Sequence, residues 1–386
     1  MRIGIVIPNT PSYSETFFNA KIERLLAAGN EVILFSKNQG SYKKTKVIEP
    51  LNQNVFGFLR FILIALFNFS SLHKFYKLES RTRESKTRAF KNTYLNAHIL
   101  QKKLDWLHFG YATAAIGRER VAKCIGAKLA VSFRGYDINV YPLKNANCYS
   151  LLWEHVDKVH SVSKYLLDKA KTYGLPDNVD YEIIYDAADT SIINKFDTQP
   201  LMPDPTFTIV TIGRLNWIKG VQYAIQGIGE IKDDLGDFKY LIIGGGTKHE
   251  FEYMRFLIQE YGLEEQIILK GEQSHSDTID LLRTADLYLQ PSIGEGFCTS
   301  VTEAQALGKV CIVTDAGGLP ENIVNNVTGY IVPKMNIKDL SSRILAFLSL
   351  SDSIRSKMSL EAKKRTQEYL SIENQIEKFI EFYKTQ

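Results

Sequence analysis

Two glutamates in the second half of the chain have the type and spacing needed to bind vicinal hydroxyl groups. Glu295 lies in the glycine-flanked segment 292–297, and Glu303 follows eight residues later on a predicted helix. Eight residues on a helix return a side chain toward the same face, and ionised carboxylates accept several hydrogen bonds. The pair predicts a site for a sugar or a ribose. The alternative is a glutamate favoured by the helix dipole beside an ordinary surface glutamate.

Two permanent cations, Arg214 and Lys219, lie five residues apart in the segment 213–220, between a predicted strand and a predicted helix. Both cations and the positive end of that helix can face one cleft, an arrangement that suits a pyrophosphate. Taken singly, either cation would also fit an ordinary solvated loop.

A run of glycines, Gly244 to Gly246, follows another predicted strand and permits close backbone approach to a ligand. Because Lys248 and His249 come next, the run is not a G-x-G-x-x-G fingerprint, and a tight turn is an equal alternative. The loop 315–321, with two glycines before a proline, has the same two interpretations.

Short apolar runs, each followed by a loop and a helical stretch, recur along the whole chain and predict two α/β domains with parallel sheets. The predicted strands are 2–8, 31–36, 105–110, 128–135, 158–163 and 181–187, then 207–213, 239–246, 266–271, 286–292 and 310–315. Open sheets of this kind bind ligands at the carboxyl ends of their strands, which is where the glutamates and cations lie.

Three prolines within 200–205 mark a change in composition and predict a linker at 195–206. We therefore expect an acceptor-binding domain at 1–194 and a donor-binding domain at 207–370. The remaining segment, 371–386, is expected to be a helix that can pack back on the first domain.

Taken together, the motifs of the second half resemble those of the family-four retaining glycosyltransferases of the GT-B fold. They match in order and spacing, and the glutamate pair within Gly-Glu-Gly-Phe is the most specific of them. The resemblance implies two Rossmann-like, doubly wound domains facing one another across a cleft. It also implies a nucleotide-sugar donor, UDP- or GDP-linked, and retention of the anomeric configuration.

By this resemblance, Arg214 and Lys219 would hold the diphosphate and stabilise charge on the departing nucleotide. Glu295 would contact the donor sugar, and Glu303 would bind the ribose hydroxyls. The other residues implied in donor binding are Gly213, Gly244, Gly246, Gly296, Phe297 and Cys298.

The first half resembles exopolysaccharide transferases of the colanic-acid type, through its first loop and the segment 130–137. Many relatives have a histidine where this chain has Arg134, and arginine cannot act as a base at neutral pH; it can bind a sugar or a phosphate. The residues expected at the acceptor are Ser14, Glu15, His108, Arg134 and Asp137.

No nucleophile with a convincing partner emerges in the first half, which favours a front-face displacement in which the leaving phosphate helps deprotonate the acceptor. The enzyme would then supply position and charge stabilisation. We expect no metal and no cofactor, because Arg214 and Lys219 can replace a metal's charge and no D-x-D motif ends a strand.

Charge is unevenly distributed: residues 1–200 carry a net +10 and residues 201–386 a net −6. The apolar segment 55–69 is shorter than the roughly 20 residues of a spanning helix and predicts a core or an interfacial helix. The basic run in 71–103 after it favours an anionic membrane surface as a partner, although a solvated helix face is the plainer alternative. Nucleic acid is not expected.

No signal peptide and no disulfide framework are indicated, so we expect a cytoplasmic protein, peripheral on the inner face of the cell membrane. The expected acceptor is a glycan, lipid-linked, in the synthesis of surface polysaccharide or glycoconjugate. Two rivals remain open: a sugar-nucleotide epimerase of the same architecture and a non-catalytic nucleotide-binding protein. An NAD-dependent dehydrogenase is less favoured, because no complete glycine fingerprint follows the first strand.

Overall fold

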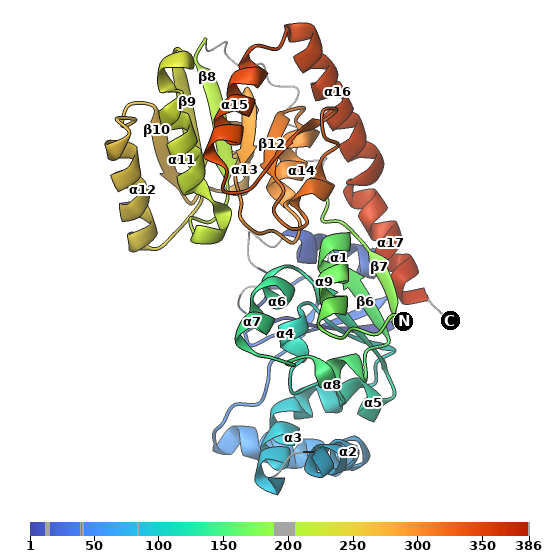
Figure 1. Ribbon diagram of the computed structural model, residues 1–386. Helices are drawn as coiled ribbons and strands as arrows, with labels where there is room; N and C mark the ends of the chain where they lie inside the picture. Colours follow the sequence, from blue (N-terminus) through green and yellow to red (C-terminus); the bar gives the residue numbers. More distant parts are fainter. Residues whose placement is uncertain (12–15, 39, 41, 83–84, 189–204, 385–386) are drawn as a thin grey trace. The chain divides into compact units, whose positions relative to one another are not determined.

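The computed structural model describes residues 1–11, 16–38, 40, 42–82, 85–188 and 205–384. The chain forms two compact units (Figure 1). Unit 1 comprises Met1–Ile184 together with Ile376–Gln386, and unit 2 comprises Tyr185–Gln375. Most of the predicted linker, 195–206, lies outside the described residues.

Unit 1 is built on a seven-stranded parallel sheet in the order β3-β2-β1-β4-β5-β6-β7. Its strands are β1 (Arg2–Val6), β2 (Glu31–Phe35), β3 (Lys46–Ile48), β4 (Trp106–Phe109), β5 (Lys128–Phe133), β6 (Lys158–Ser161) and β7 (Asp180–Ile183). The central strands are buried along nearly their whole length, as expected where helices cover both faces of a parallel sheet.

The helices of unit 1 are α1 (Thr16–Ala27), α2 (Val55–Thr82), α3 (Lys86–Leu100), α4 (Ala112–Ala115), α5 (Val121–Ile125), α6 (Tyr136–Asn139), α7 (Tyr141–Lys144), α8 (Ser150–Trp153) and α9 (Lys164–Thr172). The last helix of the chain, α17 (Ile372–Lys384), also contributes to this unit. Its Phe379, Phe382 and Tyr383 are buried in one core cluster with Ile3 and Trp106.

Unit 2 has a six-stranded parallel sheet in the order β10-β9-β8-β11-β12-β13. Its strands are β8 (Phe207–Ile212), β9 (Phe238–Ile243), β10 (Ile267–Gly271), β11 (Leu287–Gln290), β12 (Val310–Thr314) and β13 (Gly329–Val332). Its helices are η1 (Trp217–Lys219), α11 (Val221–Glu230), η2 (Lys232–Asp234), α12 (Lys248–Glu260), α13 (His275–Arg283), α14 (Thr299–Ala306), η3 (Leu319–Asn322), α15 (Ile337–Leu348) and α16 (Asp352–Tyr369).

Alternation along the strands of unit 2 builds two cores, one on each face of its sheet. Ile209 and Tyr240 belong to one cluster, which α11, α12 and α15 complete. Their neighbours Val210 and Leu241 belong to the other, which α13 and α14 complete. Successive side chains of a strand point to opposite faces, so both faces of this sheet are covered.

Both sheets have the strand order of a doubly wound Rossmann-like domain, which confirms the predicted fold class. In each sheet the chain runs outward in one direction and then reverses, so the switch points lie between β1 and β4 and between β8 and β11. Ligands of such sheets bind beyond the carboxyl ends of the strands at this point. The segments 213–220 and 291–298 follow β8 and β11, and therefore flank the switch point of unit 2.

Several elements differ from the sequence predictions. The short strands β3 and β13 were not predicted, and several others end two or more residues earlier than expected. The segment 55–69, predicted as a helix of about fifteen residues, is the first half of the 28-residue α2, which contains one non-helical residue, Asn68. By length and composition alone, Val55–Arg81 could cross a membrane.

Candidate active site

The loop after β8 turns sharply and brings Lys219 back beside the strand end. Gly220 ends η1 with a φ of +64°, and a Cβ atom there would lie 2.0 Å from the carbonyl oxygen of Pro291 in the loop after β11. Only glycine tolerates both the left-handed backbone and this close approach. Gly220 therefore fixes the two loops of the switch point against one another, with Arg214 exposed on the first.

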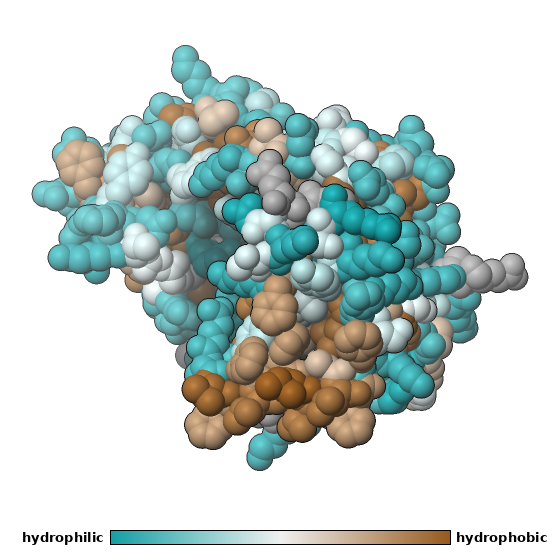
Figure 2. Space-filling view, turned by 90° about the horizontal axis from the view of Figure 1, so that it is seen from below, coloured by the Kyte–Doolittle hydropathy of each residue, from teal (hydrophilic) through white to brown (hydrophobic). Residues whose placement is uncertain are grey.

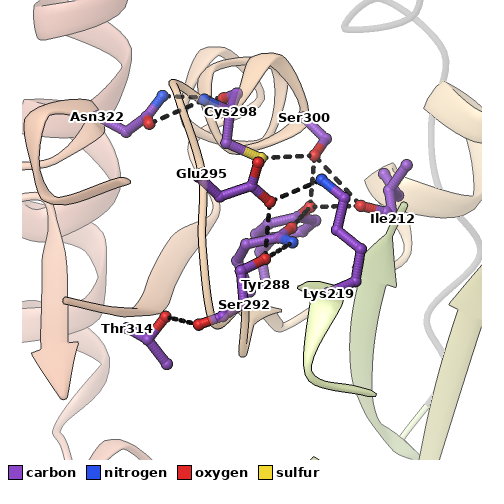
Figure 3. Close-up of polar contacts among 10 residues, drawn as sticks. Ile212, Lys219, Tyr288, Ser292, Glu295, Cys298, Ser300, Thr314 and Asn322 are labelled. Carbon is purple, nitrogen blue, oxygen red and sulfur yellow. Dashed lines mark hydrogen bonds and ion pairs between the residues drawn. The ribbon is translucent and has the colours of Figure 1, made fainter. Parts of the chain in front are cut away.

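Lys219 and Glu295 form an ion pair at this point, with Nζ and Oε1 2.6 Å apart (Figure 3). Only 18% of the lysine side chain and 10% of the glutamate side chain are exposed. Burial alone disfavours the cation, but the Glu295 carboxylate more than offsets it and the pKa of Lys219 is raised. The site thus holds a charged lysine next to a carboxylate, largely shielded from water.

A series of hydrogen bonds between buried polar side chains fixes the position of the Glu295 carboxylate (Figure 3). Its Oε1 accepts a hydrogen bond from Ser292 at 2.7 Å, and Ser292 accepts one from Gln290 at 2.9 Å. Gln290 in turn accepts one from the hydroxyl of Tyr288 at 2.7 Å. The carboxylate position is therefore set by β11 itself, since Tyr288 and Gln290 belong to this strand.

The second predicted carboxylate has a separate partner that the sequence did not reveal. Oε1 of Glu303, on α14, lies 2.8 Å from Nε2 of His275, the first residue of α13. Both side chains are more than four-fifths buried. Glu295 and Glu303 thus each pair with their own basic group. The available signal for His275 was its place just after β10, at the carboxyl end of the same sheet.

The glycine run after β9 lets two loops approach. A Cβ atom on Gly244 would lie 2.0 Å from the carbonyl oxygen of Gly213, and one on Gly246 would lie 2.7 Å from Cβ of Leu215. The N–H of Leu215 donates to the carbonyl of Gly245 at 2.7 Å. This packing explains the glycines, while their contact with a ligand stays a prediction.

The start of α14 is fastened by Asn322, another residue that was not predicted. Its Oδ1 accepts from the N–H of Cys298 at 3.1 Å, and its Nδ2 donates to the Cys298 carbonyl at 2.8 Å. Phe297, next to the buried Gly296, stacks on Tyr185 with ring centroids 5.0 Å apart. Burial raises the pKa of the Cys298 thiol, which therefore stays protonated at neutral pH.

In unit 1, Asp137 organises the loop after β5. Its carboxylate accepts hydrogen bonds from the N–H groups of Arg134 (3.0 Å), Gly135 (2.8 Å) and Ala112 (3.1 Å). The side chain is buried, and burial raises its pKa. The Arg134 guanidinium lies over the ring of Phe18 at 5.0 Å. Ser14 and Glu15 lie outside the described residues.

His108 is fully buried within a directed chain of hydrogen bonds. Because the Ile184 carbonyl can only accept, Nε2 of His160 donates to it, at 3.0 Å, and Nδ1 of His160 accepts from Ser132 at 2.8 Å. Ser132 then accepts from Nε2 of His108 at 2.8 Å, which leaves Nδ1 of His108 to accept from the Tyr383 hydroxyl at 2.5 Å. Both rings are therefore neutral, and burial lowers both pKa values well below the ordinary one.

Among the described residues, no three histidine, cysteine, aspartate or glutamate side chains are grouped so that they could hold a metal ion. The charged and titratable side chains described above for the unit 2 site are Arg214, Lys219, Glu295, Glu303 and His275.

Residues 193–365 match the family described as glycosyl transferases group 1. The chain is 27% identical over 252 residues to the putative colanic acid biosynthesis glycosyltransferase WcaL of Escherichia coli, covering 63% of this chain and 61% of that protein. It is 23% identical to the protein of the same name from Salmonella typhimurium, covering 96% of each.

Solved structures share the fold over nearly the whole chain. A glycosyltransferase from Rickettsia africae has a TM-score of 0.74 at 21% identity and covers 99% of this chain and 97% of its own. Anabaena HepE, in complex with UDP and glucose, has a TM-score of 0.72 at 15% identity and covers 99% of this chain and 98% of its own. Residues 193–365 therefore carry a domain of the glycosyl transferases group 1 family, and the chain as a whole has the GT-B fold.

Proposed function

We propose that the chain transfers a sugar, with retention of configuration, from a nucleotide-sugar donor to a glycan acceptor in the synthesis of a surface polysaccharide. The observation that carries this proposal is the ion pair of Lys219 with Glu295 beside Arg214, at the switch point of unit 2. A cation here meets the diphosphate, and the carboxylate meets sugar hydroxyls. Support for the donor class comes from HepE, whose structure contains UDP and glucose.

In this reaction the bond between the anomeric carbon and the leaving phosphate oxygen breaks. The acceptor oxygen forms its bond to the same carbon on the same face, and its proton passes to the leaving phosphate. Arg214 and Lys219 stabilise the charge that develops on the diphosphate, and the interaction with Lys219 is strengthened because its side chain is mostly shielded from water. We expect this step to proceed without a divalent metal, so that a chelator leaves the rate unchanged.

The proposed donor contacts extend the same set of loops. Glu303, held by His275, binds the ribose hydroxyls, and Gly213, Gly244, Gly246 and the 296–298 segment line the donor. In unit 1 we propose that Arg134 contacts the acceptor, while Asp137 and His108 position the strand ends around it, because their polar atoms already bond within the domain. We propose Ser14 and Glu15 as further acceptor contacts.

The proposed acceptor is a lipid-linked glycan at the cytoplasmic face of the cell membrane. The names of the two enterobacterial relatives, which refer to colanic acid biosynthesis, support a polysaccharide product.

The test is nucleotide release from a panel of UDP-, GDP-, ADP- and dTDP-sugars, with Arg214→Ala and Glu295→Ala beside the wild type. We expect release from one donor and its loss in both variants. Isomerisation of a donor without acceptor would instead identify an epimerase, and nucleotide binding with no transfer to any glycan acceptor would identify a non-catalytic binding protein.

A further inference from the structure

The first half of α2 exposes an apolar face to solvent. A stripe of α2 residues at helical spacing is buried, namely Gly57, Phe61, Ile64, Leu72, Phe75 and Glu79. The residues between them in the first four turns are exposed and almost all apolar: Val55, Phe56, Phe58, Leu59, Ile62, Leu63, Leu66, Phe67 and Phe69. We call these nine residues the outer face of α2.

The exposure of the outer face is too large for a core helix. Phe56 is 81% exposed, Leu66 70% and Phe67 85%. Only 22% of the most apolar stretch of this helix is buried. Figure 2 shows apolar side chains gathered in one continuous band on this side of the molecule. Soluble proteins seldom expose contiguous apolar patches of this kind unless the patch binds something.

The buried stripe of α2 is the face that packs on the rest of unit 1. Phe61 contacts Phe90 and Tyr94 of α3, with ring centroids 5.7 and 5.2 Å apart. The helix also packs on α5, and Figure 1 shows α2 and α3 side by side in unit 1. The outer face is therefore the side that its own unit does not cover.

Beyond Phe69, which follows the non-helical Asn68 (φ −131°, ψ 30°), the exposed positions of α2 change from apolar to polar and basic. The two helices also carry exposed cations, Arg60, Lys74, Lys77 and Arg81 on α2 and Lys86, Arg88 and Lys91 on α3. Among the described residues from 52 to 95 the only acid is Glu79, which is buried and paired with Arg120 at 3.1 Å. The patch thus combines apolar side chains with a one-sided positive charge.

We propose that the outer face of α2 inserts into the headgroup region of an anionic phospholipid bilayer, with the helix lying in the plane of the membrane. A bilayer surface offers apolar chains below and negative headgroups above, which matches this face and its cations. A second copy of the same face would bring like charges together, because a two-fold interface places a patch against itself.

The length of the apolar part of α2 and the position of its cations indicate that the helix lies in the membrane plane and does not span the bilayer. The apolar part, residues 55–69, is about 22 Å long at 1.5 Å per residue, short of the roughly 30 Å hydrocarbon core. A spanning α2 of about 20 residues from Val55 would carry Arg60 into hydrocarbon, reach Lys74 at its end, and abandon its packing on α3. Membrane attachment by this face goes beyond the proposed function: it is a property of unit 1, and the donor site belongs to unit 2.

The first test is flotation of the full chain with vesicles of phosphatidylcholine alone or mixed with phosphatidylglycerol. We expect flotation with the mixed vesicles and its reduction by salt. Leu63→Ser with Phe67→Ser, and separately Lys77→Glu with Arg81→Glu, should each weaken binding by about tenfold or more. Matched controls on exposed positions of unit 2 are Ile354→Ser with Leu360→Ser, and Lys338→Glu with Lys357→Glu; these should float like the wild type.

The second test measures how deeply the two ends of the outer face lie in the bilayer. Phe56→Trp and Phe67→Trp each add one tryptophan to the outer face, and the wild-type fluorescence is subtracted as background. Lipids brominated at a shallow position should quench the fluorescence of the two added tryptophans equally. Unequal depths would show a spanning helix and overturn the in-plane arrangement. Three results would contradict binding to a membrane surface: failure to float, flotation independent of lipid charge, or dimerisation of the chain that is abolished by Leu63→Ser with Phe67→Ser. Nucleotide release measured on the same variants separates these outcomes from failure of the proposed transferase activity.

Discussion

Lys219 Nζ lies 2.6 Å from Oε1 of Glu295, although the two residues are 76 positions apart in the chain. The cation proposed to hold the diphosphate is therefore already charged and fixed by the carboxylate proposed to hold the sugar. Because the pair is mostly buried, neither charge relies on solvent for its compensation. A site of this kind is organised before any donor arrives, which lowers the reorganisation that the reaction requires.

Removing the carboxylate should destabilise unit 2. Glu295→Gln leaves a mostly buried lysine without its counter-charge, and removing one partner of a buried pair costs about 3–5 kcal/mol. Denaturant unfolding measures the change. The matched control is Glu252→Gln, which breaks the exposed pair with Lys248 and should change the free energy of unfolding by less than about 0.5 kcal/mol. Equal effects of the two variants would contradict the role of burial.

Removing the cations should affect turnover. Lys219→Met and Arg214→Ala are each expected to lower kcat by about 10²–10³, because each removes charge stabilisation of the leaving diphosphate. Arg255→Ala, which removes an exposed arginine on α12, serves as the control and should leave kcat unchanged. A rise in KM at constant kcat would show instead that the cations act only in ground-state binding.

His275 should act on donor binding through Glu303. His275→Ala removes the group that lies 2.8 Å from the carboxylate and lets Glu303 adopt other rotamers. We expect the donor KM to rise by about three- to tenfold, the equivalent of about 1 kcal/mol for a lost hydrogen bond, with kcat nearly constant. Steady-state kinetics with His249→Ala, a change at an exposed histidine of α12, provides the comparison. If kcat fell and KM did not, His275 would have another role.

Gly220 and Gly271 offer a matched pair for the close approach at the switch point. Both have a left-handed φ, +64° and +69°, so alanine introduces similar backbone strain of about 1 kcal/mol at each. Only at Gly220 does the new Cβ meet a backbone oxygen, that of Pro291 at 2.0 Å, whereas nothing lies within 4 Å at Gly271. Gly220→Ala should therefore destabilise the protein several-fold more, and equal melting temperatures of the two variants would contradict this geometry.

Acid should destabilise unit 1 below about pH 6.5. Burial lowers the pKa of His98 to about 3 and holds the pKa values of His108 and His160 well below the ordinary one. The unfolded chain takes up these protons near pH 6.5 while the folded chain does not, so stability is present above that pH and is lost as pH falls through it. The loss approaches about 1.4 kcal/mol per pH unit for each histidine.

Denaturant unfolding between pH 7.5 and about 5.5 measures this dependence. His160→Gln should reduce the slope by about the contribution of one histidine, although the variant is less stable overall because the hydrogen bonds with Ser132 and Ile184 are changed. His249→Gln, at a side chain 94% exposed, should leave the slope unchanged. An unchanged slope in His160→Gln would place the pH dependence elsewhere.

Much of the fold could be predicted because apolar runs and glycine-containing loops recur with the period of an α/β domain. Most strands were predicted to within a few residues, while β3 and β13 were missed because each is a short element at the edge of its sheet. The kink at Asn68 and the continuation of α2 were also missed, since the residues after 69 are polar and their helical partners lie on α3.

For the site, the sequence by itself determined the residue types and their position after the strands: Arg214, Lys219, Glu295 and Glu303. Only the tertiary structure decided the pairing. It joined Lys219 to Glu295 and Glu303 to His275, because strand order brings β8 beside β11, and neither spacing nor composition specifies which loops become neighbours. The tertiary structure also decided that the outer face of α2 is exposed. The sequence shows that the helix is apolar, but only the packing of α3 and α5 determines which of its faces is covered.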